Sequence, residues 1–291
     1  MTHPTRQQIR AAFDAAAHSY DEVAALQREV ADRLLERLEL LRMQPSQILD
    51  LGSGTGYCSA ALAKRYPKAR ITALDLSPAM LQQTRQRFSG WQRLRGRCAA
   101  CCGDASQLPF ADASFDMILS SLTLQWCGDL AQTFGELQRV LRPGGVLQFT
   151  TLGPDTLREL RQSWAAVDDE VHVNHFHDMH DVGDAMLQAR LAEPVLDMEY
   201  ITLTYQDSFG LMRDLKGIGA HNRNPGRPGG LTGKQKLRAM QAHYERFRGA
   251  DGLLPATYEI VYGHAWRGEP KPDNGEGEFH FPIDKLRGGK G

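Results

Sequence analysis

The sequence predicts an α/β fold built on a doubly wound, mostly parallel sheet. Over roughly the first half of the chain, short apolar segments suited to buried strands alternate with segments of helical periodicity. A glycine-rich turn at residues 52–56 directly follows the first of these apolar segments. Strands and helices that alternate at this pitch indicate parallel strands joined by right-handed crossovers.

The N-terminal segment, residues 5–45, is expected to be helical. From Ile9 to Leu41, apolar residues recur at steps of three and four, which places them along one face of a helix. We therefore expect an N-terminal helix ahead of the first strand.

The core units follow in chain order. The expected strands are residues 47–51, 70–76, 115–121 and 145–151, with one further strand ahead of Gly103. The expected helices between them are residues 59–66, 79–88 and 130–141. Pro67 ends the first of these helices, and a turn at Pro143, Gly144 and Gly145 stops the last.

The later part of the chain is expected to complete a seven-stranded sheet. A helix at about 156–167 precedes strands at 200–205 and 257–266. Two helical segments, 209–218 and 234–248, separate these last two strands. They predict a helical insertion that acts as a lid over the sheet.

We expect one domain over residues 1–267, with the lid insertion at about 206–253. Residues 268–291 are rich in Gly, Pro and charge, which favours a flexible tail. Within that tail, residues 279–283 could dock as a short edge strand.

Composition argues against some classes of protein. The 34 basic and 35 acidic residues leave a net charge of −1, so no global field draws the chain to nucleic acid or to a membrane. No apolar run approaches the roughly 20 residues of a membrane span, and the polar N-terminus is unlike a signal peptide. The five cysteines lack a regular spacing, which is typical of reduced thiols. We therefore expect a cytoplasmic location.

The glycine-rich turn predicts a ligand site at the carboxyl ends of the strands. Gly52, Gly54 and Gly56 lack a Cβ, so the loop can adopt positive φ angles and turn backbone N–H groups toward a carboxylate or phosphate. Asp75 ends the second strand, where its carboxylate can accept hydrogen bonds from both hydroxyls of a ribose. A dinucleotide would suit these features too, but the nicotinamide fingerprint G-x-G-x-x-G needs a glycine where Tyr57 stands.

Further signals follow the third and precede the fifth strand. Gly103 and Asp104 place a second carboxylate where it can accept from an adenine amino group, and residues 142–145 read R-P-G-G. These features, in this order, resemble the class I S-adenosylmethionine-dependent methyltransferases, which have a Rossmann-like fold. The resemblance implies S-adenosyl-L-methionine as the cofactor. The cofactor-binding residues that it implies are Tyr20, Gly52, Ser53, Gly54, Gly56, Asp75, Leu76, Asp104, Ala105 and Ser120.

Stretches outside the cofactor core resemble a narrower family, the malonyl-acyl-carrier-protein O-methyltransferases of biotin synthesis. The matching stretches are residues 12–20, 26–28, 74–81, 125–128, 149–152 and 213–220. The resemblance implies methyl transfer to the free carboxylate of a malonyl group carried on acyl carrier protein or coenzyme A. The product is a methyl ester that primes pimeloyl synthesis. The carboxylate is already ionised at pH 7, so no general base is expected.

A cation in the insertion is expected to select the charged acyl end. Arg213 is the first candidate, because its planar fork can hold a carboxylate bidentately, and Lys216 is the second. Acyl carrier proteins are acidic, and the insertion is rich in basic residues. The predicted docking surface for the carrier consists of Arg223, Arg227, Lys234, Lys236 and Arg238.

Three clusters are set aside, the histidines as polar surface, the cysteines as free thiols and the arginines for lack of a nucleic-acid recognition motif, so no metal and no nucleic acid is expected. They are the histidines 172, 175, 177 and 180, the cysteines 98, 101 and 102, and the arginines 85, 87, 93, 95 and 97. Rival readings remain open. They are a class I methyltransferase acting on another small acid or a quinone, a nicotinamide-binding oxidoreductase, and a non-catalytic cofactor sensor.

Overall fold

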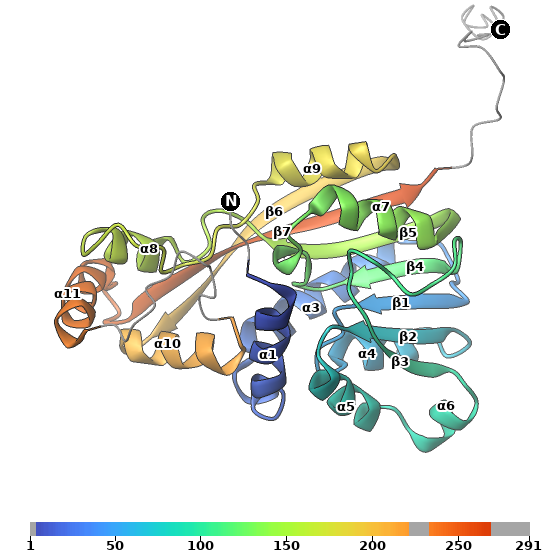
Figure 1. Cartoon of the computed structure of the whole chain (residues 1–291), viewed down its shortest axis with the longest axis horizontal. Helices are drawn as coiled ribbons and strands as arrows, with labels where there is room; N and C mark the ends of the chain where they lie inside the picture. Colours follow the sequence, from blue (N-terminus) through green and yellow to red (C-terminus); the bar gives the residue numbers. More distant parts are fainter. Residues whose placement is uncertain (1–3, 221–232, 269–291) are drawn as a thin grey trace, which may run out of the picture.

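The computed structural model describes residues 4–220 and 233–268, and its centre is one seven-stranded sheet (Figure 1). The strands lie in the order β3-β2-β1-β4-β5-β7-β6, so the order reverses between β1 and β4. The strands are β1 (Gln47–Leu51), β2 (Arg70–Asp75), β3 (Cys98–Cys102), β4 (Phe115–Ser120), β5 (Leu141–Leu152), β6 (Leu191–Tyr205) and β7 (Leu254–Arg267). Only β7 runs antiparallel to its neighbours β5 and β6. The predicted doubly wound, mostly parallel sheet is confirmed.

Helices cover both faces of this sheet. The core helices are α4 (Tyr57–Arg65), α5 (Pro78–Arg87), α6 (Gly90–Leu94), α7 (Leu130–Val140), α8 (Arg158–Ala165) and α9 (Met179–Gln188). Successive side chains of a strand point to opposite faces, so Ile48 packs in the cluster with Leu62 of α4 while Leu49 packs with Phe134 of α7. Each face therefore has its own hydrophobic core.

The N-terminal segment is broken where the sequence predicted one helix. It forms α1 (Arg6–Ala16), α2 (Tyr20–Val23), α3 (Ala25–Arg37) and the short 3-10 turn Leu38–Leu40. Helical periodicity in a sequence indicates which residues are buried, not whether the helix is continuous. The apolar pattern continues across the break because both helices bury one face, α1 against α5 and α3 against α4. The break places Tyr20 at the start of α2, beside the glycine loop.

Two boundaries in the later strands also differ from expectation. β6 begins at Leu191, ahead of the expected start at residue 200. Asp197 and Glu199 give this part of the strand a loop-like composition, but their carboxylates pair with Arg37 and Arg33 of α3 at 2.8 and 2.6 Å. β5 begins at Leu141. The expected turn at residues 143–145 is therefore a bulge inside β5, where the register with β4 shifts.

The insertion between β6 and β7 contains α10 (Ser208–Gly217), α11 (Lys234–Tyr244) and a 3-10 turn at Glu245–Phe247. These helices lie at the end of the molecule where β6 and β7 continue past the last paired residue of β5 (Figure 1). Within residues 4–220 and 233–268, no helix is long and apolar enough to cross a membrane. The predicted tail lies outside the described residues, apart from Gly268.

Candidate active site

The glycine loop joins β1 to α4 and bends tightly around the end of β2. Gly52, Gly54 and Gly56 all have positive φ angles, of +70°, +53° and +87°. The loop is anchored because the N–H of Gly52 donates to the carbonyl of Leu74 at 2.7 Å. A Cβ on Gly52 would lie 2.0 Å from Oγ1 of Thr123, so a side chain does not fit there without movement.

Asp75 lies where the loop meets the end of β2. Its Oδ2 accepts from the N–H of Gly54 and its Oδ1 from the N–H of Ser77, both at 2.8 Å. Burial raises the pKa of the Asp75 carboxyl to about 6, although these backbone donors oppose the rise. The carboxylate is therefore held in a fixed orientation, with each oxygen able to accept one more hydrogen bond.

A cavity of about 350 Å³, here called the main cavity, opens above the loop. Seven of the ten predicted cofactor-binding residues line it, namely Tyr20, Gly52, Gly54, Asp75, Leu76, Asp104 and Ala105. Ser53 lines an adjoining cavity of about 60 Å³, here called the third cavity. Gly56 and Ser120 line none of the cavities described here. Gly56 is instead the N-cap of α4, and the hydroxyl of Ser120 donates to the carbonyl of Leu51 at 3.1 Å, so both support the loop.

Asp104 lies across the main cavity from the glycine loop. Its Oδ1 accepts from the N–H and the hydroxyl of Ser106, at 2.8 and 2.9 Å. Its Oδ2 lies 2.5 Å from Nε of Arg6, on the N-terminal helix. Arg6 therefore forms part of the cavity wall. The sequence analysis missed it, since only the folded chain brings α1 over the strand ends.

Tyr20 lines the main cavity, the third cavity and another space of about 60 Å³, here called the second cavity. Burial, reinforced by the charge of Asp75, raises the pKa of the Tyr20 phenol, so the phenol is neutral at physiological pH. Phe13 packs edge-to-face on Trp126 with ring centroids 5.4 Å apart, and both rings line the main and second cavities. These aromatic side chains form the boundary between the two spaces.

Asp50 is a second buried carboxyl, and the sequence analysis missed it within an apolar strand. It lines the third cavity behind the glycine loop, and its Oδ2 accepts from the hydroxyl of Ser59 at 2.5 Å. Burial raises the pKa of Asp50 to about 7, while the Ser59 hydrogen bond opposes the rise. A carboxyl at this depth is suited to receive a cationic group from the cavity.

The contact of Arg213 and Lys216 with the substrate carboxylate stays a prediction, because the structure places both residues on the surface of the insertion. Both side chains are exposed on α10 and line none of the three cavities. The glycines of this stretch have a packing role. A Cβ on Gly217 would lie 2.8 Å from Cγ2 of Val23, and one on Gly219 would lie 3.1 Å from the carbonyl oxygen of Ala12. The matched stretch thus brings the end of α10 against α1 and α2.

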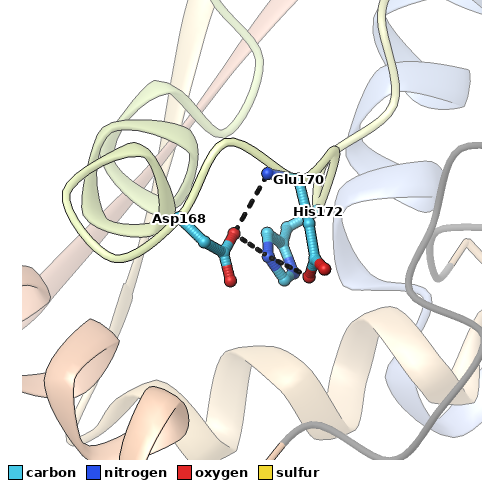
Figure 2. A group of neighbouring side chains, drawn as sticks. All are labelled: Asp168, Glu170 and His172. Carbon is cyan, nitrogen blue, oxygen red and sulfur yellow. Dashed lines mark hydrogen bonds and ion pairs between the residues drawn. The ribbon is translucent and has the colours of Figure 1, made fainter.

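The histidine-rich loop holds an ion-pair network. In the described part of the chain, the only group of three or more potential metal-ligating residues whose ligand atoms all lie within 4.8 Å of one another is Asp168, Glu170 and His172 (Figure 2). Nζ of Lys236 lies 2.8 Å from Oδ2 of Asp168 and 3.4 Å from Oε2 of Glu170. The ring of His172 also stacks on that of Trp164, with the ring centroids 3.7 Å apart. The ammonium group of Lys236 thus pairs with both carboxylates of this group, and these ion pairs link α11 to the loop after α8.

The strand order and the glycine turn are those of the class I methyltransferase fold, and residues 49–149 match the family model described as Methyltransferase domain. The YcgJ protein from Bacillus subtilis has a related crystal structure, with a TM-score of 0.56 and 15% identity over 84% of this chain and all of that one. At that identity the likeness supports the fold alone. The class of protein is therefore a class I methyltransferase.

The relatives identify the family within this class. A protein of Gallionella capsiferriformans named malonyl-[acyl-carrier protein] O-methyltransferase is 52% identical over 268 residues, which cover 91% of this chain and 92% of that one. A protein of the same name from Halorhodospira halophila is 51% identical over 97% of this chain and 95% of that one. The chain belongs to the malonyl-[acyl-carrier protein] O-methyltransferase family, which confirms the resemblance found in the sequence.

Cofactor binding is expected to weaken below pH 6. The raised pKa of Asp75, about 6, means that the free protein takes up a proton there as the pH falls. A protonated carboxyl accepts less strongly from ribose hydroxyls, so the Kd of S-adenosylhomocysteine should be flat above about pH 7 and rise at most tenfold per unit below pH 6. Calorimetric titration from pH 5 to 8 measures this dependence. The Asp50→Asn variant should bind more weakly at neutral pH but keep the rise in Kd below pH 6, whereas loss of that rise in this variant would assign it to Asp50.

Proposed function

We propose that this protein transfers the methyl group of S-adenosyl-L-methionine to the free carboxylate of a malonyl thioester, carried on acyl carrier protein or coenzyme A. One structural observation on this chain supports the proposal independently of its relatives. The main cavity, with Asp75 on its wall, adjoins the second cavity through the shared residues Phe13, Tyr20, Leu122 and Trp126. A cofactor and an acyl acceptor can therefore meet at this boundary.

The cofactor supplies an electrophilic methyl group on a sulfonium. The residues of the main cavity fit it, because Asp75 has free acceptor positions for ribose hydroxyls and the carboxyl of Asp50 lies behind the loop, suited to an ammonium group. In the proposed reaction a carboxylate oxygen of the substrate bonds to the methyl carbon as the carbon–sulfur bond breaks. The electron pair returns to sulfur, which leaves a neutral thioether and a methyl ester.

The chain's own residues act by orientation and by excluding water. Because the substrate carboxylate is ionised at neutral pH, no residue has to remove a proton from it. Holding the two reacting atoms in line can lower the barrier by about 7–11 kcal/mol. Phe13, Tyr20 and Trp126 border the meeting point with aromatic surface, which favours a step in which opposite charges neutralise one another.

The carrier is proposed to dock on the basic face of α11. Of the five predicted docking residues, Lys236 is engaged by Asp168 and Glu170, and Arg223 and Arg227 lie outside the described residues. Lys234 and Arg238 are exposed on α11 and remain the proposed contacts for an acidic carrier. The product would be an ester whose masked charge permits elongation toward pimelate for biotin. We place this proposed reaction in the cytoplasm.

Methyl transfer from labelled cofactor tests the function directly. Label is expected in malonyl carrier protein, or in malonyl-coenzyme A, and absent from the matching acetyl thioesters, which have no free carboxylate. The sulfur product is expected to be S-adenosylhomocysteine. Turnover of a small acid or a quinone with no transfer to either malonyl thioester would overturn the proposal.

The docking surface predicts a carrier-specific salt effect. The double variant Lys234→Glu and Arg238→Glu is expected to raise the KM for malonyl carrier protein about tenfold at low salt, because two favourable long-range contacts become repulsive. The KM for malonyl-coenzyme A should change little. Lys68→Glu, an exposed reversal in the loop after α4, is the matched control. If the KM for the carrier protein changes neither with ionic strength nor in the double variant, α11 is a solvent-exposed helix face and not a docking surface.

A further inference from the structure

The second cavity has amide side chains on its wall and lies on the acceptor side of Tyr20. Its lining comes from α1 to α3, the loop after β4, the 3-10 turn Leu124–Trp126, the end of β5, the loops on either side of α8, the end of α10, and β7. Gln27, Gln125 and Asn174 supply its amides. No charged side chain lines it among residues 4–220 and 233–268. A cavity that must select a carboxylate therefore needs its positive charge from behind the wall.

Arg161 of α8 supplies such a charge. Its Nη1 donates to the carbonyl of Pro154 at 2.6 Å, and its Nη2 donates to those of Thr156 and Asn174 at 3.1 and 3.3 Å. Thr156 and Asn174 both line the second cavity. The guanidinium thus binds the carbonyl groups of the two loops that form this part of the wall.

The charge of Arg161 is not cancelled by an ion pair. Within the described ranges, 4–220 and 233–268, no carboxylate oxygen lies within 4.0 Å of its guanidinium nitrogens, and its buried Nε has no hydrogen-bond partner. Burial lowers the pKa of Arg161, but an arginine stays protonated in a protein. The more distant negative charge of Asp155 opposes this lowering of the pKa. A half-buried cation whose hydrogen bonds go only to carbonyl groups still projects a positive potential into the adjacent space.

Asn174 has unused hydrogen-bonding capacity. Its side-chain Oδ1 is buried and has no partner in the part of the chain that the structure describes. The oxygen and nitrogen of an amide can exchange places by a flip, so this position can offer an N–H to a ligand. Its backbone carbonyl is meanwhile fixed by Arg161.

We propose that the second cavity is the carboxylate subsite for the acyl acceptor, with Asn174 as a specificity-determining donor and Arg161 as the positioning residue that holds and polarises it. This inference rests on the proposed function and deepens it. It assigns the positive charge to Arg161 in place of Arg213, whose side chain is exposed on α10. The ligand class is a short acyl thioester with a free carboxylate at its far end.

Kinetics of four variants test the subsite. Arg161→Gln is expected to raise the KM for malonyl carrier protein at least about tenfold with a smaller change in kcat, and Arg161→Lys should recover part of the loss. The Kd of S-adenosylhomocysteine should stay within about twofold of the wild-type value, since Arg161 does not line the main cavity. Arg158→Gln, on the same helix but ion-paired with Asp155, is the matched control.

Asn174→Asp gives a readout that a structural role would not produce. The added negative charge should raise the KM about a hundredfold, because it repels the substrate carboxylate, and should leave the Kd of S-adenosylhomocysteine within about twofold of the wild-type value. Asn174→Ala should show a smaller rise in KM. These two variants decide the case even if Arg161→Gln does not fold.

The outcomes separate the inference from the function on which it rests. If the wild-type protein does not methylate malonyl thioesters, the proposed function is wrong. If the wild type is active but the Asn174 and folded Arg161 variants keep a normal KM, the subsite is wrong while the function stands. A tenfold KM defect confined to Arg213→Ala would return the carboxylate contact to α10.

Discussion

Replacing Asp75 by alanine is expected to weaken binding of S-adenosylhomocysteine by at least about a hundredfold. Hydrogen bonds to a charged acceptor contribute about 1.5–3 kcal/mol each, and this carboxylate is proposed to accept two from the ribose. The substitution also frees the N–H groups of Gly54 and Ser77, which now donate to it at 2.8 Å. Cofactor affinity and turnover should therefore fall together.

Calorimetric titration measures this effect, with circular dichroism to establish that the variant is folded. Asp197→Ala serves as the control, because that carboxylate also accepts from a cation, Arg37, but lies on β6 and lines none of the cavities. It should leave the affinity unchanged. A folded Asp75→Ala protein that binds with nearly normal affinity would remove Asp75 from the cofactor site.

A large stability loss from a single added methyl group is expected at Gly263 in β7. Gly263 pairs with Phe149 of β5, and a Cβ there would lie 2.0 Å from Cζ of that fully buried ring. The ring cannot move aside without disturbing the core it shares with Phe134, 5.4 Å away. Overpacking of this kind costs about 3 kcal/mol, so the urea midpoint of Gly263→Ala should fall markedly.

Gly135→Ala in α7 is the matched control for the same chemical change. A Cβ at Gly135 meets no atom within 4 Å, and the backbone there is helical. Alanine is favoured over glycine inside a helix, so this variant should gain about 0.5–1 kcal/mol. Equal midpoints for the two variants would contradict the packing argument.

Features dictated by neighbours in the chain were predicted well. The glycine turn and Asp75 were found because positive φ angles and a strand end leave a local trace in the sequence. The sheet was predicted for the same reason, since strand and helix periodicities are properties of short segments. The predicted family rested on such local stretches and is confirmed by the relatives.

Features that depend on distant contacts were missed or stay predictions. Asp50 lies inside an apolar strand, and nothing local shows that its partner is Ser59 on the following helix. Arg6 reaches Asp104 only in the folded chain. The role of Arg213 stays a prediction, because the structure shows only that the stretch around it packs closely through Gly217 and Gly219. Sequence spacing alone cannot distinguish a residue that binds substrate from a neighbouring residue that only packs against another helix.

The place of β7 between β5 and β6 has a consequence for biogenesis. β6 leaves the ribosome before β7, yet its only partner in the sheet is β7. Until Arg267 has been translated, the outer edge of β5 and all of β6 remain without hydrogen-bonded neighbours, a state that invites intermolecular pairing. A premature stop ahead of β7 would therefore yield an aggregation-prone fragment that chaperones and proteases must clear, although it retains the entire nucleotide-binding half.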